Sequence, residues 1–194
     1  MSRVFLAGAT GVIGRELVPL LVAGGHVVAG LTRSPDKAAS LREAGAEPVV
    51  ADVYDRSALT AAVTAFGPDM VIHQLTDLPD ELDRLPEYGA ANDRIRTEGT
   101  GNLLDAAAAA SARRFLAQSI AWELPGDRQR AVDEHERMVL DAGGVVLRYG
   151  MFHGPGTYQE GEVPDDEPRV HVATAARRTV ELLDAPSGVY TVLD

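Results

Sequence analysis

Short apolar runs alternate along this chain with longer stretches in which apolar residues recur every three or four positions. The runs are continuous and rich in β-branched residues, which is typical of strands buried on both faces of a parallel sheet. The longer stretches have the period of helices that cover such a sheet. The pattern predicts strands at 3–7, 26–31, 48–51, 69–74, 114–118, 145–148 and 188–193, and helices at 12–23, 35–44, 56–66, 90–110, 129–141 and 172–183. This alternation predicts an α/β fold in which helices cover both faces of a doubly wound parallel sheet, in three αβα layers.

Residues that begin and end helices agree with this periodicity. Gly24 and Gly45 fall where the first two helices should end, and Ser34 and Asp55 fall where the second and third should begin. After residue 148 the pattern loosens into the acidic, turn-rich stretch 155–169, which we interpret as a mobile loop or lid. A chain of 194 residues with this order of elements is expected to form a single domain, 1–194.

Charge and composition narrow the class of ligand. The 29 acidic and 18 basic residues give a net charge of -11 without a basic block, so nucleic acid and anionic membranes would be repelled. There is no cysteine and no metal-ligand spacing among the five histidines, which predicts that no metal is bound. No apolar run approaches the roughly 20 residues that span a bilayer, and the chain opens on a strand instead of a signal segment. We expect a cytoplasmic protein that binds a small molecule.

A glycine triplet gives the most specific signal of a ligand. Gly8, Gly11 and Gly14 follow the first apolar run and open the first helix, together with Thr10, Val12 and Ile13. Glycine at these positions permits a sharp turn, a close approach of the backbone to a pyrophosphate and close packing of helix on sheet. The helix N-terminus then offers N–H donors to phosphate. The triplet predicts a dinucleotide site; taken as a bare string, it is equally compatible with an ordinary turn.

The end of the second strand bears on which dinucleotide is bound. An acidic residue there normally binds the ribose hydroxyls of NAD, whereas a basic residue accommodates the 2′-phosphate of NADP. This strand ends in Thr32, Arg33 and Ser34, and the first acid, Asp36, lies further on. A planar guanidinium beside two hydroxyls suits a phosphate, so we predict a preference for NADP(H) over NAD(H). The alternative is that Arg33 is a solvated loop charge.

Polar residues also follow the third and fourth strands. Asp52 and Val53 are placed to meet an adenine edge, or Asp52 is instead the N-terminal cap of the next helix. His73, Gln74 and Leu75 end the fourth strand at the carboxyl edge, where open α/β sheets bind ligands. The alternative for His73 is a hydrogen-bonded histidine of the strand, and we favour it.

These segments together resemble the short-chain dehydrogenase/reductase superfamily, in particular its extended and atypical members of the NAD-dependent epimerase/dehydratase type. The resemblance includes Asn92 and the stretches 98–105, 115–119 and 147–156, in the order and spacing of that family. It implies a Rossmann-like fold, a cofactor-binding role for Asn92, and a place for Ser119 where the family's catalytic serine ends the fifth strand.

The catalytic pair of the family is missing. A tyrosine four residues before a lysine follows the catalytic serine in that family, and the only lysine of this chain is Lys37. His135 and Tyr149 are the substitutes that we consider first, and Tyr158 and His153 are further ones. The plainer alternatives are that His135 is exposed on a charged helix, that Tyr149 only packs, and that Ser119 is a remnant. A Gly-x-Ser-x-Gly hydrolase motif is also missing.

The stretch 155–169 stands in place of most of the family's substrate lobe, which leaves three hypotheses of function. The first is an oxidoreductase or isomerase that binds NADP(H) and acts on a small carbonyl or hydroxyl compound. The second is a catalytically silent NADP(H) sensor or partner subunit. The third is a non-redox cyclase or dehydratase that reuses the fold. A reduced lobe leaves apolar surface uncovered, so we also expect a homodimer.

Overall fold

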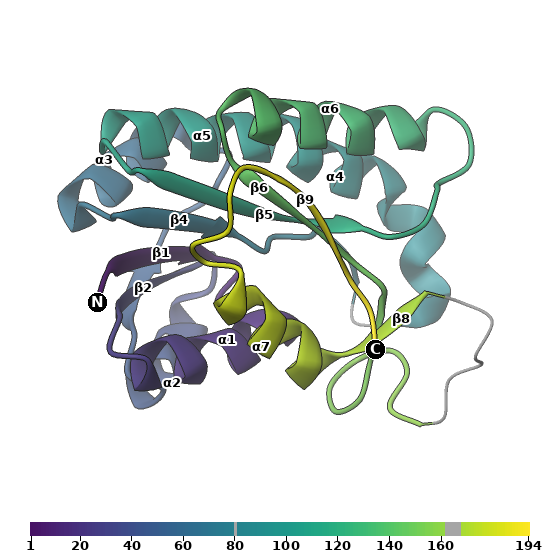
Figure 1. The fold of residues 1–194 in the computed structure, drawn as a ribbon, viewed down its shortest axis with the longest axis horizontal. Coiled ribbons are helices and arrows are strands. Elements are labelled where there is room, and N and C mark those ends of the chain that lie inside the picture. The colour runs from purple at the N-terminus through teal and green to yellow at the C-terminus, as the bar shows by residue number, and fades with distance from the viewer. Residues whose placement is uncertain (80, 162–167) are drawn as a thin grey trace.

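A seven-stranded parallel sheet forms the centre of the molecule (Figure 1). The computed structural model describes residues 1–79, 81–161 and 168–194, so part of the predicted acidic loop, 162–167, lies outside the described residues. The strand order is β3-β2-β1-β4-β5-β6-β9, as in a doubly wound sheet whose order reverses beside β1. The strands are β1 (Arg3–Ala7), β2 (Val27–Thr32), β3 (Glu47–Val50), β4 (Met70–His73), β5 (Arg114–Ile120), β6 (Val145–Tyr149) and β9 (Gly188–Val192). The predicted α/β fold is confirmed.

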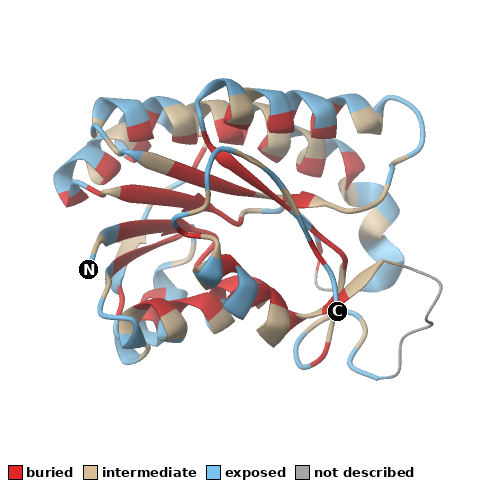
Figure 2. Cartoon of the chain, viewed as in Figure 1, coloured by how far each residue is buried: buried red, intermediate tan, exposed pale blue. Residues whose placement is uncertain are grey.

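Helices cover both faces of this sheet. One face carries α1 (Val12–Ala23), α2 (Ala38–Glu43) and α7 (Val172–Glu181), and the other carries α3 (Arg56–Phe66), α5 (Thr100–Ala109) and α6 (Arg128–Asp141). Alternate residues of β1 enter opposite cores, Leu6 facing α1 and Phe5 facing α3, which explains why the strand is apolar at every position after Arg3. Buried residues accordingly line the strands and the inner sides of the helices (Figure 2).

The predicted helix 90–110 is three segments. It consists of α4 (Gly89–Arg94), the π-helical turn η3 (Ile95–Gly99) and α5, and the 3₁₀ segment η2 (Leu82–Tyr88) occupies part of the loop expected before it. The Thr100 hydroxyl lies 3.4 Å from the Ile95 carbonyl at the end of the π-helical turn. A π-helical turn inserts one residue into an otherwise helical periodicity, so an alanine-rich pattern does not reveal it, and such turns are frequent at functional sites.

Two short elements were not predicted. The strands β7 (Met151–His153) and β8 (Arg169–His171) pair in parallel on either side of the acidic stretch. Three residues are too few for a period to show in the sequence. The remaining 3₁₀ segment, η1 (Pro35–Lys37), forms the start of the second predicted helix.

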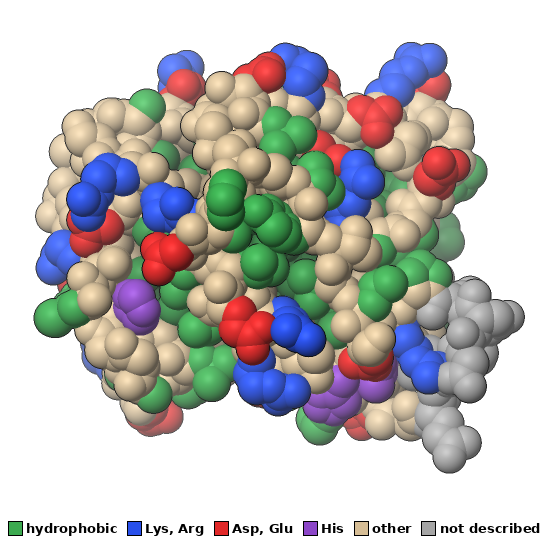
Figure 3. Space-filling model, in the orientation of Figure 1, with side chains coloured by type: hydrophobic (Ala, Val, Ile, Leu, Met, Phe, Trp, Pro, Cys, Tyr) green, Lys and Arg blue, Asp and Glu red, His purple; other side chains and the backbone are tan. Residues whose placement is uncertain are grey.

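The described residues contain no helix that is long and apolar enough to cross a membrane. Within the same residues no group of three or more His, Asp or Glu side chains is arranged to hold a metal ion. On the face shown in Figure 3, basic and acidic side chains lie interspersed.

Candidate functional site

The glycine turn after β1 is closed by contacts that leave no room for side chains at two of its positions. Gly8 has φ +89°, and a Cβ there would lie 2.6 Å from the Gln74 carbonyl oxygen at the end of β4. A Cβ on Gly14 would lie 2.1 Å from the Gly8 oxygen. Gly11, the N-cap of α1, supplies no side chain to cap the helix. The first N–H groups of α1 are therefore directed to the carboxyl edge between β1 and β4, where the sheet order reverses and where phosphate would bind.

A small hollow lies next to this turn, at the carboxyl ends of β2, β3 and β4. Its lining brings together residues that the sequence assigned to the cofactor, namely Thr32, Arg33, Val53 and Leu75. The full lining is Leu31, Thr32, Arg33, Ala51, Val53, Leu75, Thr76, Asp77 and Ile95. Apolar side chains form its floor and polar groups stand at its rim, so the chemistry of the lining suits the adenosine end of a dinucleotide.

The polar residues beside this hollow have partners within the protein. Thr32 is buried, and its hydroxyl accepts a 3.2 Å hydrogen bond from the Ser34 N–H. The Asp52 carboxylate accepts a 2.9 Å bond from the Tyr54 N–H. Asp55 caps α3 through a 3.0 Å bond from the Ala58 N–H, so the alternative that Asp52 is the helix cap is wrong.

Asn92 is buried behind the segment that follows β4. Its Oδ1 accepts a 3.1 Å hydrogen bond from the Asp77 N–H. Asn92 therefore positions the loop that lines the hollow, and its side-chain oxygen is engaged within the protein.

His73 and His135 belong to one buried network that passes through Thr100. The Leu75 N–H donates to Nδ1 of His73, so Nε2 of His73 carries the hydrogen that Thr100 Oγ1 accepts at 3.1 Å. The Thr100 hydroxyl donates at 2.8 Å to Nδ1 of His135, and Nε2 of His135 donates at 2.8 Å to the Gln118 carbonyl. The Gln118 side-chain amide donates at 2.9 Å to the Leu75 carbonyl, which closes the network.

This network decides between the alternatives that the sequence left open for His73 and for His135. His73 is a hydrogen-bonded strand histidine, as favoured, whereas the expectation that His135 is exposed is wrong, since only 2% of it is accessible. The spacing of His135 from Val132 and Val139 places it on the buried face of α6, even though most of that helix is charged. Burial lowers the pKa of both histidines, that of His73 to well below its usual range, and both ring nitrogens of each are engaged in the neutral state.

Tyr149 lies between the sheet and α7 with its hydroxyl fully engaged. It accepts a 3.1 Å hydrogen bond from the Gln74 amide, and its oxygen lies 2.6 Å from Oγ1 of Thr179. Thr179 donates its own hydrogen to the Ala175 carbonyl, so the tyrosine proton points to Thr179. Burial raises the pKa of Tyr149 to about 12. These contacts favour the packing alternative for Tyr149 over a role as a proton donor.

Ser119 stands near the end of β5 and has a partner that the sequence did not indicate. Its hydroxyl donates a 2.6 Å hydrogen bond to Oε1 of Glu136 on α6. Arg148 on β6 holds the same carboxylate, with Nε 2.9 Å from Oε1 and Nη2 2.5 Å from Oε2. Ser119 and Glu136 are both buried, and the bidentate pair with Arg148 holds the carboxylate in place. The hydrogen of the Ser119 hydroxyl is therefore directed to the carboxylate, and the oxygen keeps lone pairs that can accept a hydrogen bond.

The other candidate substitutes, His153 and Tyr158, lie just before and within the acidic stretch and bond to residues outside it. Nε2 of His153 lies 2.6 Å from Oδ2 of Asp194, and the Tyr158 hydroxyl donates to the Pro79 carbonyl.

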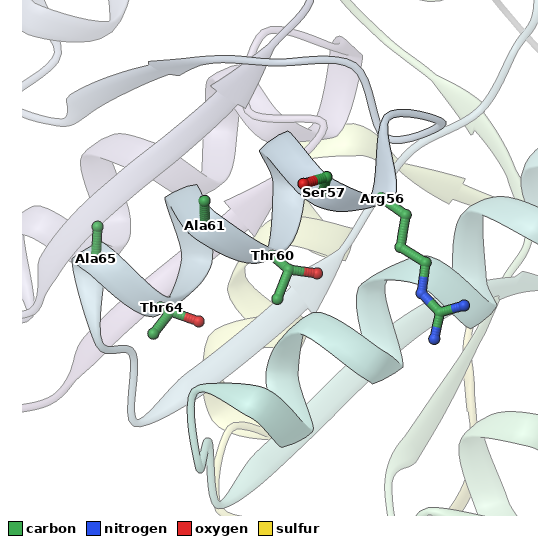
Figure 4. A pocket seen from close by; sticks show the side chains of 6 residues that line it. All are labelled: Arg56, Ser57, Thr60, Ala61, Thr64 and Ala65. Carbon is green, nitrogen blue, oxygen red and sulfur yellow. The ribbon is translucent and has the colours of Figure 1, made fainter.

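A larger, open hollow runs along α3, away from the carboxyl edge. Figure 4 shows its lining, which consists of Arg56 and the small side chains Ser57, Thr60, Ala61, Thr64 and Ala65. Arg56 points to α5, where it pairs with Asp105 at 2.7 Å. Arg56 is paired with Asp105 and the other side chains of the lining are small and uncharged, so we place the functional site at the glycine turn.

A parallel sheet of this order, with a glycine turn at the point of reversal, defines a dinucleotide-binding α/β protein. Comparison with known families agrees: the chain belongs to the family described as NAD(P)H-binding, whose model matches residues 8–143.

Individual relatives and solved structures extend this assignment. The chain is similar to a 3-diazoavenalumate denitrifying reductase from a Streptomyces species, with 45% identity over 179 residues that cover 80% of this chain and 58% of the relative. Its fold is similar to that of a UDP-glucose 4-epimerase from Thermus thermophilus solved with NAD, with a TM-score of 0.79, 21% identity, and coverage of 98% of this chain and 77% of that one. It is also similar to ChuY, an anaerobillin reductase from Escherichia coli O157:H7, with a TM-score of 0.73, 22% identity, and coverage of 98% and 96%. The NAD(P)-binding class that the resemblance implies is confirmed by the family model, and the solved epimerase shares the fold.

Proposed function

We propose that this chain is an NADP(H)-dependent reductase or isomerase that acts on a small molecule. The observation that carries the proposal is the glycine turn, in which Gly8 and Gly14 are packed against backbone oxygens and the uncapped α1 faces the carboxyl edge. At Gly8 and Gly14 a larger residue would collide with backbone oxygens, a restriction that an ordinary loop does not impose. The similarity to a reductase of Streptomyces supports hydride chemistry, and that protein is longer than the part that this chain spans.

Each part of the proposed cofactor would contact a different group of residues. Gly8, Gly11 and Gly14, with Thr10, Val12 and Ile13, would hold the pyrophosphate. Val53 and Leu75 would contact the adenine, Asp52 would face its edge, and Arg33 with Ser34 would contact the 2′-phosphate. The bound nicotinamide would supply a hydride. Ser119, backed by Glu136, would orient the substrate by accepting a hydrogen bond at Oγ, because Ser119 lies towards the carboxyl end of β5 and its oxygen keeps lone pairs.

The substrate class proposed from the sequence is a small carbonyl or hydroxyl compound. The name of the Streptomyces relative, a reductase of a diazo compound, adds diazo compounds to the classes that should be assayed. Replacement of the diazo group by hydride releases dinitrogen, and the hydride itself supplies the hydrogen that the carbon gains.

The decisive experiment follows the hydride. Purified chain, NADPH labelled with deuterium at C4 and a panel of aldehydes, ketones and an arenediazonium salt would be incubated, and the products analysed by mass spectrometry. Deuterium in a product at a rate above that without protein supports the proposal. Binding of NADPH without transfer to any substrate would support the silent NADP(H) sensor or partner instead, and failure to bind either nucleotide would exclude both.

The silent alternative is favoured by one observation. His135 and Tyr149, the two substitutes considered first for the missing tyrosine and lysine, are both enclosed and have their protons committed to other groups of the protein. Turnover without a cofactor would instead identify the non-redox cyclase or dehydratase. A single domain, a cytoplasmic location and a homodimer remain predictions, and light scattering of the purified chain tests the last of them.

A further inference from the structure

Arg33 and Asp77 face each other across the hollow beside the end of β2. Nη2 of Arg33 lies 3.3 Å from Oδ1 of Asp77. Among the described residues that line the hollow, Arg33 is the only basic one and Asp77 the only acidic one. Their charges therefore cancel at the place where a 2′-phosphate needs a cation.

The two partners of this pair differ in how firmly they are held. The Asp77 main chain is fixed by its hydrogen bond to the buried Asn92, and the Asp77 side chain is 22% exposed. The Arg33 side chain is 58% exposed and has no second partner among the described residues. The carboxylate is thus the positioned partner, and the guanidinium is the one that is free to turn towards a ligand.

The pKa of the neighbouring Tyr54 phenol is shifted by both Asp77 and Arg33. The Tyr54 hydroxyl is enclosed and has no hydrogen-bond partner in the described part of the chain. Burial raises the pKa of Tyr54, the Asp77 carboxylate raises it further, and the guanidinium groups of Arg94 and Arg33 lower it. The carboxylate and the guanidinium therefore contribute opposing fields at the rim of the hollow.

We propose that Asp77 is a specificity-determining residue of the cofactor site, which restrains the preference for NADP(H) that Arg33 confers. Its carboxylate engages the guanidinium that a 2′-phosphate would require, and it repels that phosphate. The same carboxylate can accept a hydrogen bond from the 2′-hydroxyl that NAD(H) carries instead. This inference rests on the proposed function, because it places the adenosine end of the cofactor in the hollow.

The test is the Asp77→Asn variant, which keeps the size of the side chain and the main-chain bond to Asn92. Dissociation constants for NADPH and NADH would be measured by fluorescence titration. We expect the ratio Kd(NADH)/Kd(NADPH) to rise about fivefold, since a surface ion pair contributes up to about 1 kcal/mol and that energy corresponds to about a factor of five. In an Arg33→Ala background the same change should alter the ratio less, because the competition for the guanidinium is gone.

Asp36→Asn is the matched control. It removes the same charge from η1, three residues after Arg33, and should leave the ratio unchanged within about twofold. If the wild type binds both nucleotides and Asp77→Asn leaves the ratio unchanged, the inference is overturned while the proposed function stands. An equal change in the two dissociation constants leaves this ratio unchanged and overturns the inference in the same way. Thermal unfolding verifies that the variant is folded, and Asp77→Ser repeats the test if the amide is not tolerated.

Discussion

The hydroxyl of Thr100 donates a 2.8 Å hydrogen bond to Nδ1 of His135, and this bond joins α5 to α6 inside the molecule. Because Thr100 also accepts from His73, the one hydroxyl connects two helices to the end of β4. Both peptide groups of Leu75 are held by the same network, the N–H by His73 and the carbonyl by Gln118. The backbone that lines the cofactor hollow is thus supported from the interior of the protein.

Replacing Thr100 by valine should destabilise the protein by about 2–3 kcal/mol, because the hydrogen-bonding groups of two buried imidazoles lose their common partner. Urea unfolding followed by circular dichroism measures this change. Thr97→Val is the matched control, since Thr97 lies one turn earlier, is half-buried, and bonds only to backbone carbonyls of its own helix. That control should change stability by less than about 0.5 kcal/mol. Equal effects of the two substitutions would contradict the role given to the network.

The same two histidines make stability depend on pH. Their pKa values are lowered by burial in the folded protein, so below about pH 6.5 the unfolded chain binds more protons than the folded one. Stability should therefore be full above pH 7 and fall as the pH drops below 6.5, by up to about 1.4 kcal/mol per pH unit for each histidine. Urea unfolding at pH 7.5, 6.5 and 5.5 tests this, and His135→Gln should reduce the slope by about half. An unfolding free energy that is constant between pH 7.5 and 5.5 would show that the histidines are not buried as neutral groups.

Most of the fold could be predicted because the central strands β1, β4 and β6 are buried on both faces. Continuous apolar runs marked β1, and the glycines and Asp55 marked where α1 ended and α3 began, so the bounds of these three elements agree with the prediction. The π-helical turn before Thr100 could not be predicted, because none of the residues in its sequence, Ile-Arg-Thr-Glu-Gly, distinguishes a π-helical turn from an α-helix. Strand pairs as short as β7 and β8 depend on tertiary contacts that no local pattern encodes.

The sequence predicted the candidate site only in those parts that residues close together in the chain form. The glycine turn and the end of β2 are local motifs, and the structure places both at the carboxyl edge. The partners Asp77 and Glu136 were missed, because Asp77 meets Arg33 from 44 residues away and Glu136 follows a histidine in a helix rich in charge. A charged residue on the same helical face as Val132 and Val139 was the available signal for Glu136.

Ser119 and Tyr149 should differ in their effect on activity. If the proposed reaction uses the serine, Ser119→Ala should lower kcat by about 10²-fold while the Kd for NADPH stays unchanged, since the hydroxyl lies at the sheet edge beside Glu136. Tyr149→Phe should lower stability by about 1–2 kcal/mol through the unpaired Gln74 amide and change kcat by less than about threefold. Steady-state kinetics and urea unfolding of both variants separate the two roles. A large loss of kcat in Tyr149→Phe alone would reverse the assignment.

Gly11 offers a test of the phosphate site that spares the fold. Its φ of -76° and ψ of 177° are available to alanine, and a Cβ there would meet only the Gly8 oxygen, at 3.3 Å. Gly11→Ala should therefore remain folded, with stability within about 1 kcal/mol of the wild type, yet bind NADPH at least about tenfold more weakly, because the methyl group occupies the approach of the pyrophosphate. Gly101→Ala is the control, since no atom beyond its neighbours and its own helix backbone lies within 4 Å of a Cβ at that position. It should stabilise the protein by up to about 1 kcal/mol and leave NADPH affinity unchanged. If Gly11→Ala binds NADPH as tightly as Gly101→Ala does, the pyrophosphate does not lie on this turn and the site must be sought elsewhere on the sheet.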